Sequence, residues 1–349
     1  MFRSEHLTPY EIFIKAYLSF AKIHYDAAEY STEVKKLNLS PSQIKRCTPE
    51  FSPASTELGK ALEWRISARD LLFASDDHLG LIKECLDDGS ASSTPEILGT
   101  GVTGEVRVLK QIPTIAEKKI AGLQDADSYE DAHTFKKVIR EFVCYVLAHP
   151  ENLGREDLYC AIELRNENPT ARIRMEHYTG ERLSEWIKGS HEGRSTEETL
   201  KTYAFALLHL AMSLKQISLK RFVHQDIQFN NIVGTEEKWN LIDFGSAYFL
   251  DEGPGELGKI DLEQFKLEAS ANLDILKEKL TIFSEKDKTT MAQLESIIDK
   301  IDSVDVGKTI VNLRKIAINP HEANLYGKKS NPWANATVIP WSGAGLHRF

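Results

Sequence analysis

Two neighbouring segments of the chain carry polar residues at a spacing suited to phosphoryl transfer. Residues 222–232 contain His224, Asp226 and Asn231, and residues 241–245 contain Asp243 in an apolar-apolar-Asp-Phe-Gly run. A carboxylate such as that of Asp226 can accept the proton of an attacking hydroxyl. The amide oxygen of Asn231 and the carboxylate of Asp243 are of the ligand type that Mg²⁺ prefers. These residues predict transfer of a phosphoryl group with the help of a divalent cation.

Together the two segments resemble the catalytic and metal-binding loops of the protein-kinase superfamily. A lone His-x-Asp would be weak, because loops favour Asp and Asn. Here an apolar lead-in, His-x-Asp, an Asn five residues after the Asp, an Ile-Val pair and Asp-Phe-Gly follow in order. The resemblance implies that Asp226 is the catalytic base, that Asn231 and Asp243 bind Mg²⁺ or Mn²⁺, and that ATP is the phosphate donor.

Upstream glycines and β-branched residues predict a hairpin that covers phosphates. Residues 99–106 read G-x-G-x-x-G-x-V. A dinucleotide-binding loop would need a helix that opens on the third glycine, whereas β-branched residues follow here. In kinases such a hairpin lies over the ATP phosphates. The resemblance therefore implies that the nucleotide is bound by Gly99, Gly101, Gly104 and Val106.

One lysine after the hairpin is expected to bind the same phosphates. Residues 115–120 are similar to the Val-Ala-Ile-Lys strand of kinases, and the match implies Lys118. Lys110 and Lys119 remain alternatives. An apolar stripe predicts a helix over 135–148, and Glu141 lies in it ahead of a His-Pro pair, as in the kinase C helix. Glu141 would then pair with the lysine and orient it; a surface charge is the alternative.

Residues 173–180 resemble the strand and hinge that join the two lobes of a kinase. The resemblance implies that backbone groups there meet adenine, with Met175 behind the base and Glu176 and Tyr178 beside it. It also implies an α+β, two-lobed protein kinase-like fold, with a β-rich small lobe, a helical large lobe and ATP in the cleft between them.

The chain divides into four predicted segments. Residues 1–90 are expected to form a helical N-terminal extension, with a helix capped at Thr8 and a second helical region from about Thr56. A small, polar, proline-closed stretch ends this extension. Residues 91–178 would be the small lobe and 179–283 the large lobe with an abbreviated activation segment. Residues 284–349 would add two amphipathic helices and an aromatic tail.

Several positions depart from the kinase pattern. Gln225 replaces the arginine before the catalytic aspartate, so a phosphorylated activation loop would lack its cationic partner. Gln228 replaces the cation that contacts the γ-phosphate, which puts the transfer rate in doubt. No Ala-Pro-Glu follows Asp243. Asp261 is either an aspartate that braces the catalytic loop or a helix N-cap.

Composition narrows the class of protein. The chain has 349 residues and a net charge of −9, which argues against a broad nucleic-acid footprint. Its four cysteines contain no C-x-x-C pair, as expected in a reducing compartment. The most apolar stretch is too short to cross a bilayer. We therefore expect a cytoplasmic protein that binds no nucleic acid.

The compact form and appended helices also resemble the kinases that some intracellular bacteria, Legionella among them, secrete into host cells. That resemblance implies the host cytosol as location, and a polyanionic or protein activator. A polyanion would need a basic pocket, for which ordinary surface charge is the alternative reading. The candidate residues are Lys136, Lys137, Arg140, Arg165, Arg172 and Arg174. The aromatic tail would pack on the lobe, or face a membrane or a partner.

The predicted function is phosphorylation of protein hydroxyls, Ser or Thr before Tyr, by ATP with Mg²⁺. The sequence does not identify the protein substrate. Three alternatives stay open: a small-molecule kinase, a kinase-fold nucleotidyl transferase that transfers AMP, and a pseudokinase scaffold without turnover.

Overall fold

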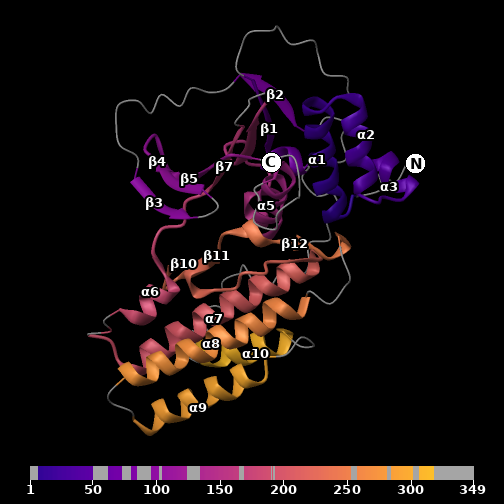
Figure 1. Cartoon of the computed structure of the whole chain (residues 1–349). Helices are drawn as coiled ribbons and strands as arrows, with labels where there is room; N and C mark the ends of the chain where they lie inside the picture. Colours follow the sequence, from indigo (N-terminus) through magenta and orange to yellow (C-terminus); the bar gives the residue numbers. More distant parts are fainter. Residues whose placement is uncertain are drawn as a thin grey trace, which may run out of the picture. The chain divides into compact units, whose positions relative to one another are not determined.

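The computed structural model describes residues 7–49, 62–72, 80–84, 96–101, 104–123, 134–164, 169–189, 191, 193–252, 258–280, 284–301 and 306–317. The chain divides into two compact units, Met1–His177 (unit 1) and Tyr178–Phe349 (unit 2). Both contain helices and strands (Figure 1), so the α+β class predicted from the sequence is confirmed. Within the described part, no helix combines the length and hydropathy needed to cross a membrane.

Unit 1 contains a seven-stranded sheet in the order β2-β1-β6-β7-β5-β4-β3. Every neighbouring pair of these strands is antiparallel. The longest strand, β5, lies between β4 and β7 and carries Lys118. The strands are β1 (Leu62–Ser67), β2 (Leu81–Glu84), β3 (Glu96–Gly101), β4 (Gly104–Leu109), β5 (Ile112–Ala121), β6 (Tyr159–Glu163) and β7 (Thr170–Glu176).

The sheet corrects one prediction about the N-terminal segment. We expected a helical region from about Thr56, but residues 62–67 form β1, which pairs with β2 and β6. Leu62 and Ile66 are four residues apart, a spacing that fits one face of a helix and one face of a strand alike. Residues 1–90 are therefore not a purely helical extension, because two of their segments join the sheet. Thr56 itself lies outside the described residues.

Five helices accompany the sheet among the described residues of unit 1. They are α1 (Pro9–His24), α2 (Ala27–Lys36), α3 (Pro41–Cys47), α4 (Ala68–Leu72) and α5 (Phe135–Ala148), with a 3-10 turn η1 (Pro150–Asn152). The bounds of α5 are those predicted from its apolar stripe. Thr8 caps α1 as expected, since its hydroxyl accepts from the Glu11 N–H and its own N–H donates to the Glu11 carboxylate.

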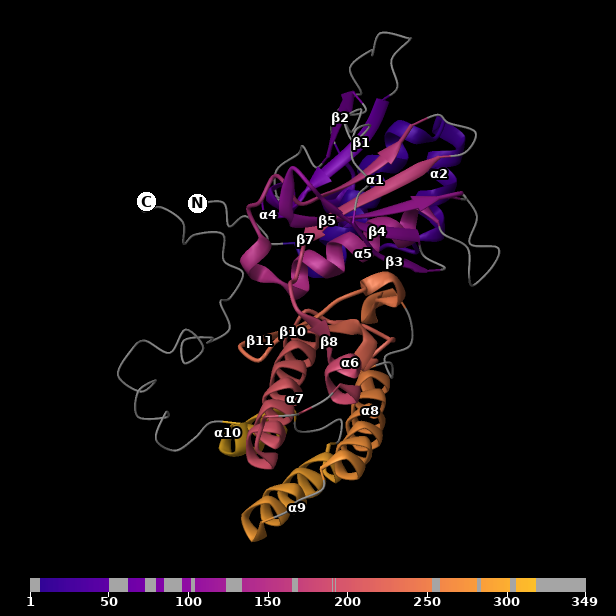
Figure 2. The ribbon, with the colours of Figure 1, turned by 90° about the vertical axis from the view of Figure 1, so that its left-hand side faces the viewer.

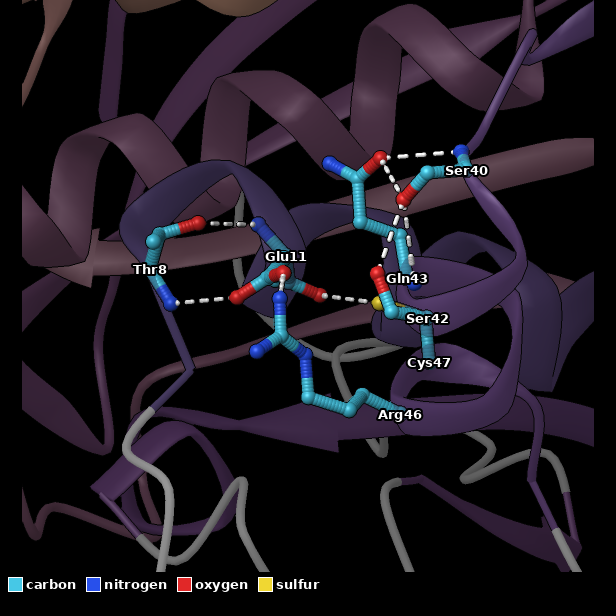
Figure 3. A network of polar contacts seen from close by, with 7 residues as sticks. All are labelled: Thr8, Glu11, Ser40, Ser42, Gln43, Arg46 and Cys47. Atoms are coloured by element: carbon cyan, nitrogen blue, oxygen red, sulfur yellow. Dashed lines mark hydrogen bonds and ion pairs between the residues drawn. The ribbon is translucent and has the colours of Figure 1, made fainter.

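Glu11 also ties α1 to α3. Its carboxylate forms an ion pair with Arg46, and its backbone oxygen accepts from Cys47 Sγ at 3.7 Å. Figure 3 shows these contacts together with the reciprocal bonds of the Ser40–Gln43 capping box that starts α3. A buried carboxylate is tolerated here because the Arg46 cation and the Thr8 backbone N–H compensate its lost hydration.

Aromatic packing joins α1 to α5 and β1. The Phe20 ring centroid lies 4.9 Å from that of Phe135 on α5 and 5.6 Å from that of Trp64 on β1. Phe20 and Trp64 are both fully buried, and the Trp64 indole donates to Ser19 Oγ at 3.3 Å. The N-terminal helix is thus part of the core of unit 1.

Unit 2 is mainly helical around the long helix α7. Figure 2 shows α7 and α8 running side by side, and α7 also contacts α9 and α10. The helices are α6 (Leu183–Lys188), α7 (Thr196–Leu219), α8 (Gly258–Lys279), α9 (Glu285–Asp299) and α10 (Val306–Ala317). The last two are the amphipathic helices predicted after Ser284. The aromatic tail lies outside the described residues.

Short strands in unit 2 hold the candidate catalytic segments. A three-stranded sheet has the order β11-β10-β8, and β12 pairs with β9. Their bounds are β8 (Glu181–Arg182), β9 (Phe222–Val223), β10 (Ile232–Thr235), β11 (Lys238–Leu241) and β12 (Tyr248–Phe249). Three 3-10 turns accompany them: η2 (Phe229–Asn231), η3 (Phe244–Ser246) and η4 (Leu250–Glu252).

We predict that Phe20→Ala destabilises unit 1 by about 3–5 kcal/mol, because it removes a fully buried ring and leaves a cavity. Amide hydrogen exchange of α1 and α5 measures the loss. Exchange in α7 should not change. The control Lys36→Ala, on the surface of α2, should alter the free energy of unfolding by no more than about 0.5 kcal/mol. Unchanged protection of α5 in Phe20→Ala would contradict this account of the packing.

A second prediction concerns His209, on α7. Its Nδ1 lies 3.3 Å from the Trp239 carbonyl oxygen, and burial lowers its pKa from 6.5 to about 4. The fold therefore favours neutral His209. As the pH falls from about 6.5 to 4, His209 takes up a proton in the unfolded chain but not yet in the folded one. Unit 2 therefore loses stability over this range, and the complete loss is on the order of 3 kcal/mol.

Urea unfolding at pH 7, 6 and 5 tests this prediction. The variant His209→Gln should lose less stability than the unmodified chain between pH 7 and pH 5. Equal losses in the two proteins would show that His209 is not the titrating group.

Candidate functional site

A buried ion pair links β5, the longest strand of the unit 1 sheet, to helix α5. Lys118 Nζ on β5 is 2.6 Å from Glu141 Oε1 on α5, and the two side chains are only 4% and 6% exposed. The structure thus forms the pair that the sequence predicted. Of the two competing lysines, Lys119 is the next residue on β5, so its side chain leaves the opposite face of the sheet, and Lys110 is exposed beside the β4–β5 turn.

The predicted glycine hairpin is formed by β3 and β4. Gly99 pairs with Val106 after a register shift, Gly101 pairs with Gly104, and Val106 pairs with Lys118 on its other side. Gly104 has φ +126°, and a Cβ there would lie 2.3 Å from the carbonyl oxygen of Lys119. Close approach to β5 therefore demands glycine at 104 whatever the hairpin binds. The turn residues 102 and 103 lie outside the described part.

The predicted adenine-binding residues fall on both sides of the division between the units. Met175 and Glu176 end β7, opposite Ala116 and Ile115 of β5. The backbone N–H of Glu176 donates to Tyr145 Oη at 2.8 Å, so it is engaged within unit 1. Tyr178 is the first residue of unit 2.

In unit 2 the Asp226 carboxylate is held by two amide side chains. Asn231 Nδ2 donates to Asp226 Oδ2 at 2.8 Å, and Gln228 Nε2 donates to Oδ1 at 2.6 Å. Asn231 Nδ2 also donates to the Asp226 carbonyl oxygen at 3.0 Å. Both Asp226 atoms are acceptors, so the Asn231 amide must present its nitrogen to them. The amide oxygen of Asn231 then points away from these two atoms. Asn231 Oδ1 is thus not the atom that faces Asp226.

Asp243 lies just after β11, the strand that pairs with β10, and β10 begins directly after Asn231. The Ile242 N–H donates to the Asn231 carbonyl oxygen at 2.9 Å, and Ile232 of β10 pairs with Leu241 of β11. Asp243 adopts the left-handed conformation, with φ 60°, and its carboxylate accepts from the Gly245 N–H at 3.4 Å. Non-glycine residues adopt this conformation mainly where surrounding structure imposes it, often at functional sites.

His224 connects the two carboxylate segments. Its Nε2 lies 3.0 Å from the Ile242 carbonyl oxygen, and its ring packs against Phe244 at 4.8 Å. Burial lowers the pKa of His224, while the carboxylates of Asp261, Asp243 and Asp226 act in the opposite direction. The imidazole is therefore a neutral, buried link between the loop of Asp226 and the strand that leads to Asp243.

The structure decides between the two roles left open for Asp261. It is the fourth residue of α8, so it is not the N-cap. Its carboxylate accepts from the backbone N–H groups of His224 and Gln225, each at 2.7 Å, while burial raises its pKa. Gln225 itself has φ 64°. Asp261 thus braces the loop that carries Asp226 in a strained conformation.

Two further residues of α8 contact the same loop, and the sequence analysis missed them. Gln264 and Glu268 accept hydrogen bonds from the backbone N–H groups of Ile227 and Phe229. Their spacing from Asp261, three and seven residues, places all three on one helix face. Polar residues at this helical spacing are visible in the sequence and could have indicated that this face of the helix contacts polar groups.

Two of the basic residues considered for a polyanion pocket, Arg172 and Arg174, have partners in the sheet. Arg172 pairs with Glu63 on β1, and Arg174 Nε lies 2.8 Å from Glu117 Oε2 on β5. Burial raises the pKa of Glu117, but hydrogen bonds from Arg107 and Arg174 lower it overall. These arginines therefore neutralise buried carboxylates of the sheet. Arg165 lies outside the described residues.

The oxygen donors of the loop fit a hard divalent cation. Among the described residues, no three His, Cys, Asp or Glu side chains gather as metal ligands. Asn231 Oδ1 and the Asp243 carboxylate are the two oxygen donors that the sequence predicts as metal ligands. Mg²⁺ commonly takes one or two carboxylates and completes its shell with water and substrate phosphates. The donor set therefore suits Mg²⁺ or Mn²⁺ bound together with a nucleotide.

We predict that Glu141→Ala destabilises unit 1 by about 3–5 kcal/mol, because it removes the partner of a buried charge. The double variant Lys118→Met/Glu141→Leu should be closer to the unmodified chain in stability, since it removes both charges. Lys119→Met, one residue along the strand, is the matched control and should be nearly neutral. Hydrogen exchange of β5 and α5 measures all four proteins, and a double variant no more stable than Glu141→Ala would contradict the pairing.

The amino-acid sequence matches no protein-family model and no curated protein. The activity of the chain must therefore be argued from the chemistry of Asp226, Asn231, Asp243 and the Lys118–Glu141 pair.

Proposed function

We propose that this chain is an ATP- and Mg²⁺-dependent phosphotransferase with a two-lobed protein kinase-like fold, and that it phosphorylates Ser or Thr hydroxyls of proteins. Unit 1 would be the small lobe and unit 2 the large lobe. The observation that carries the proposal is the Asn231 amide, whose nitrogen donates to both the carboxylate and the carbonyl oxygen of Asp226. The Asn231 oxygen would then serve as the metal ligand.

Asp226 supplies the base in this reaction. The acceptor hydroxyl oxygen bonds to the γ-phosphorus, the bond from that phosphorus to the bridging oxygen of ATP breaks, and ADP leaves with the electron pair. The hydroxyl proton passes to the Asp226 carboxylate. Gln228 and Asn231 hold one carboxylate oxygen each, which limits its rotation. Positioning of this kind supplies much of the rate enhancement in phosphoryl transfer.

Asn231 and Asp243 would hold the metal ion. Bound Mg²⁺ would neutralise negative charge on the nucleotide phosphates during transfer. The left-handed backbone at Asp243 and the Ile242–Asn231 hydrogen bond keep the two ligands on adjacent segments. Their order on the chain supports the resemblance to kinases from which the roles were inferred.

Lys118 would bind nucleotide phosphates, and Glu141 would keep its ammonium group in place. The pair is buried, so its charges interact more strongly than they would on the surface. Gly99, Gly101, Gly104 and Val106 would contribute the covering hairpin, in which Val106 pairs with Lys118. Met175, Glu176 and Tyr178 would contact adenine.

A small-molecule kinase is the second candidate, and one observation favours it. After Asp243 the chain forms η3, β12 and η4, and α8 already begins at Gly258. β12 pairs back onto β9, so this short segment runs close to the catalytic loop. It offers little length for the platform on which protein kinases dock peptides. The acceptor class therefore has to be tested together with the activity.

We predict that Asp226→Asn and Asp243→Ala each lower phosphate transfer on the order of 10³-fold or more. Asp274→Asn, an exposed carboxylate on α8, should retain full activity. Transfer is measured with γ-labelled ATP and Mg²⁺, offered with a eukaryotic lysate in one arm and a panel of small alcohols in the other. Product mass should rise by about 80 daltons, the mass of one phosphoryl group.

The outcomes separate the alternatives. Labelling of small alcohols alone would support the second candidate and overturn the protein acceptor. Transfer of label from α-labelled ATP would indicate AMP transfer and overturn phosphorylation. Nucleotide binding without any Asp226-dependent turnover would leave a pseudokinase and overturn both candidates.

A further inference from the structure

One face of α8 serves the backbone of the loop that carries Asp226. Asp261, Gln264 and Glu268 follow each other at intervals of three and four residues, so they project from the same side of the helix. Between them they accept from four backbone N–H groups, those of His224, Gln225, Ile227 and Phe229. The loop has no strand partner along this stretch, so these bonds replace secondary structure.

Gln264 forms hydrogen bonds with the backbone on both sides of Asp226. Its Oε1 accepts from the Ile227 N–H at 2.9 Å, and its Nε2 donates to the Gln225 carbonyl oxygen at 3.1 Å. The residues before and after Asp226 are thus fixed by one side chain. An amide is the smallest side-chain group that can accept one of these bonds and donate the other in a fixed relative orientation.

Glu268 holds the far end of the loop and is itself held. Its Oε2 accepts from the Phe229 N–H at 3.0 Å. Asn272, one turn further along α8, places its Nδ2 3.5 Å from the same oxygen and 2.9 Å from the Glu268 backbone oxygen. Phe229 is 1% exposed, so its side chain anchors the loop where Glu268 binds its backbone.

The helix that carries these groups is firmly packed. Phe265 of α8 is fully buried, and Tyr203 of α7 donates to the Ala269 carbonyl oxygen at 2.6 Å. Because α8 is fixed against α7, the hydrogen bonds of Gln264 and Glu268 fix the loop relative to these two helices. Gln225 has a left-handed backbone conformation, which is strained for a residue other than glycine. A loop without support would relax to relieve this strain, so the conformation needs the contacts from α8.

We propose that Gln264 and Glu268 are positioning residues for the base Asp226, acting through the loop backbone. This inference rests on the proposed phosphotransfer. Loss of either side chain leaves Asn231 and Asp243 in place but frees the loop around Asp226. Turnover falls while affinity for the Mg²⁺-bound nucleotide does not.

Four variants test the proposal: Gln264→Leu, Glu268→Ala, Glu268→Gln and the control Glu263→Ala. Gln264→Leu and Glu268→Ala should lower kcat about tenfold, the effect of losing a buried hydrogen bond. The KM for ATP should stay within about twofold. Glu268→Gln should recover most of kcat, because its amide oxygen still accepts from the Phe229 N–H. Glu263 is exposed on the other side of α8, and its variant should behave as the unmodified chain.

Amide hydrogen exchange gives a readout that does not require activity. Gln264→Leu and Glu268→Ala should speed exchange in a peptide covering 224–229, while peptides of α7 keep their protection. If the unmodified chain transfers no phosphate, the proposed function fails, and exchange still decides whether α8 holds the loop.

Three results would overturn the inference. The first is an unchanged kcat in both Gln264→Leu and Glu268→Ala. The second is an equal loss of nucleotide affinity, which would indicate damage to the whole site. The third is loss of protection in α7 together with the loop, which would make the two residues merely structural.

Discussion

The position of the loop that carries Asp226 depends on hydrogen bonds that the backbone N–H groups of residues 224–229 donate to side chains of α8. That stretch has a left-handed residue, Gln225, and no strand partner, so its buried N–H groups need acceptors from elsewhere. Asp261, Gln264 and Glu268 supply them. With the backbone held from one side, the Asp226 carboxylate is free to be oriented from the other by Gln228 and Asn231. Support of the loop and chemistry at its tip thus use different groups.

Unit 1 shows the same division between a polar pair and its support. The Lys118–Glu141 pair is buried, and desolvation makes a buried pair costly unless its geometry is good. That geometry requires α5 to stay against β5. Packing of Phe135 against Phe20 fixes one end of α5 to α1, and Trp64 fixes α1 to the sheet. The N-terminal helix therefore contributes to the position of Glu141 although it lies far from it in the sequence.

Two buried carboxylates of unit 1, those of Glu63 and Glu117, are neutralised within the sheet. Glu117 on β5 lies between Arg107 and Arg174, and Glu63 on β1 pairs with Arg65 and Arg172. Alternation along β5 puts Glu117 and Lys118 on opposite faces. One face of the sheet thus presents arginine–carboxylate pairs, and the other presents the lysine that pairs with α5.

Local sequence determined the helix 135–148, the glycine hairpin and the order of polar groups around Asp226 and Asp243, because periodicity and turn chemistry act over a few residues. It could not separate a helix from a strand at 62–67, where an apolar spacing of four suits both. It favoured Lys118 over Lys119 only through the resemblance to kinases, since the choice depends physically on which face of the sheet α5 covers. Only the tertiary structure identified Gln264 and Glu268. Their polar side chains look like a solvated helix face until a distant loop, with backbone groups that must be paired, is packed against them.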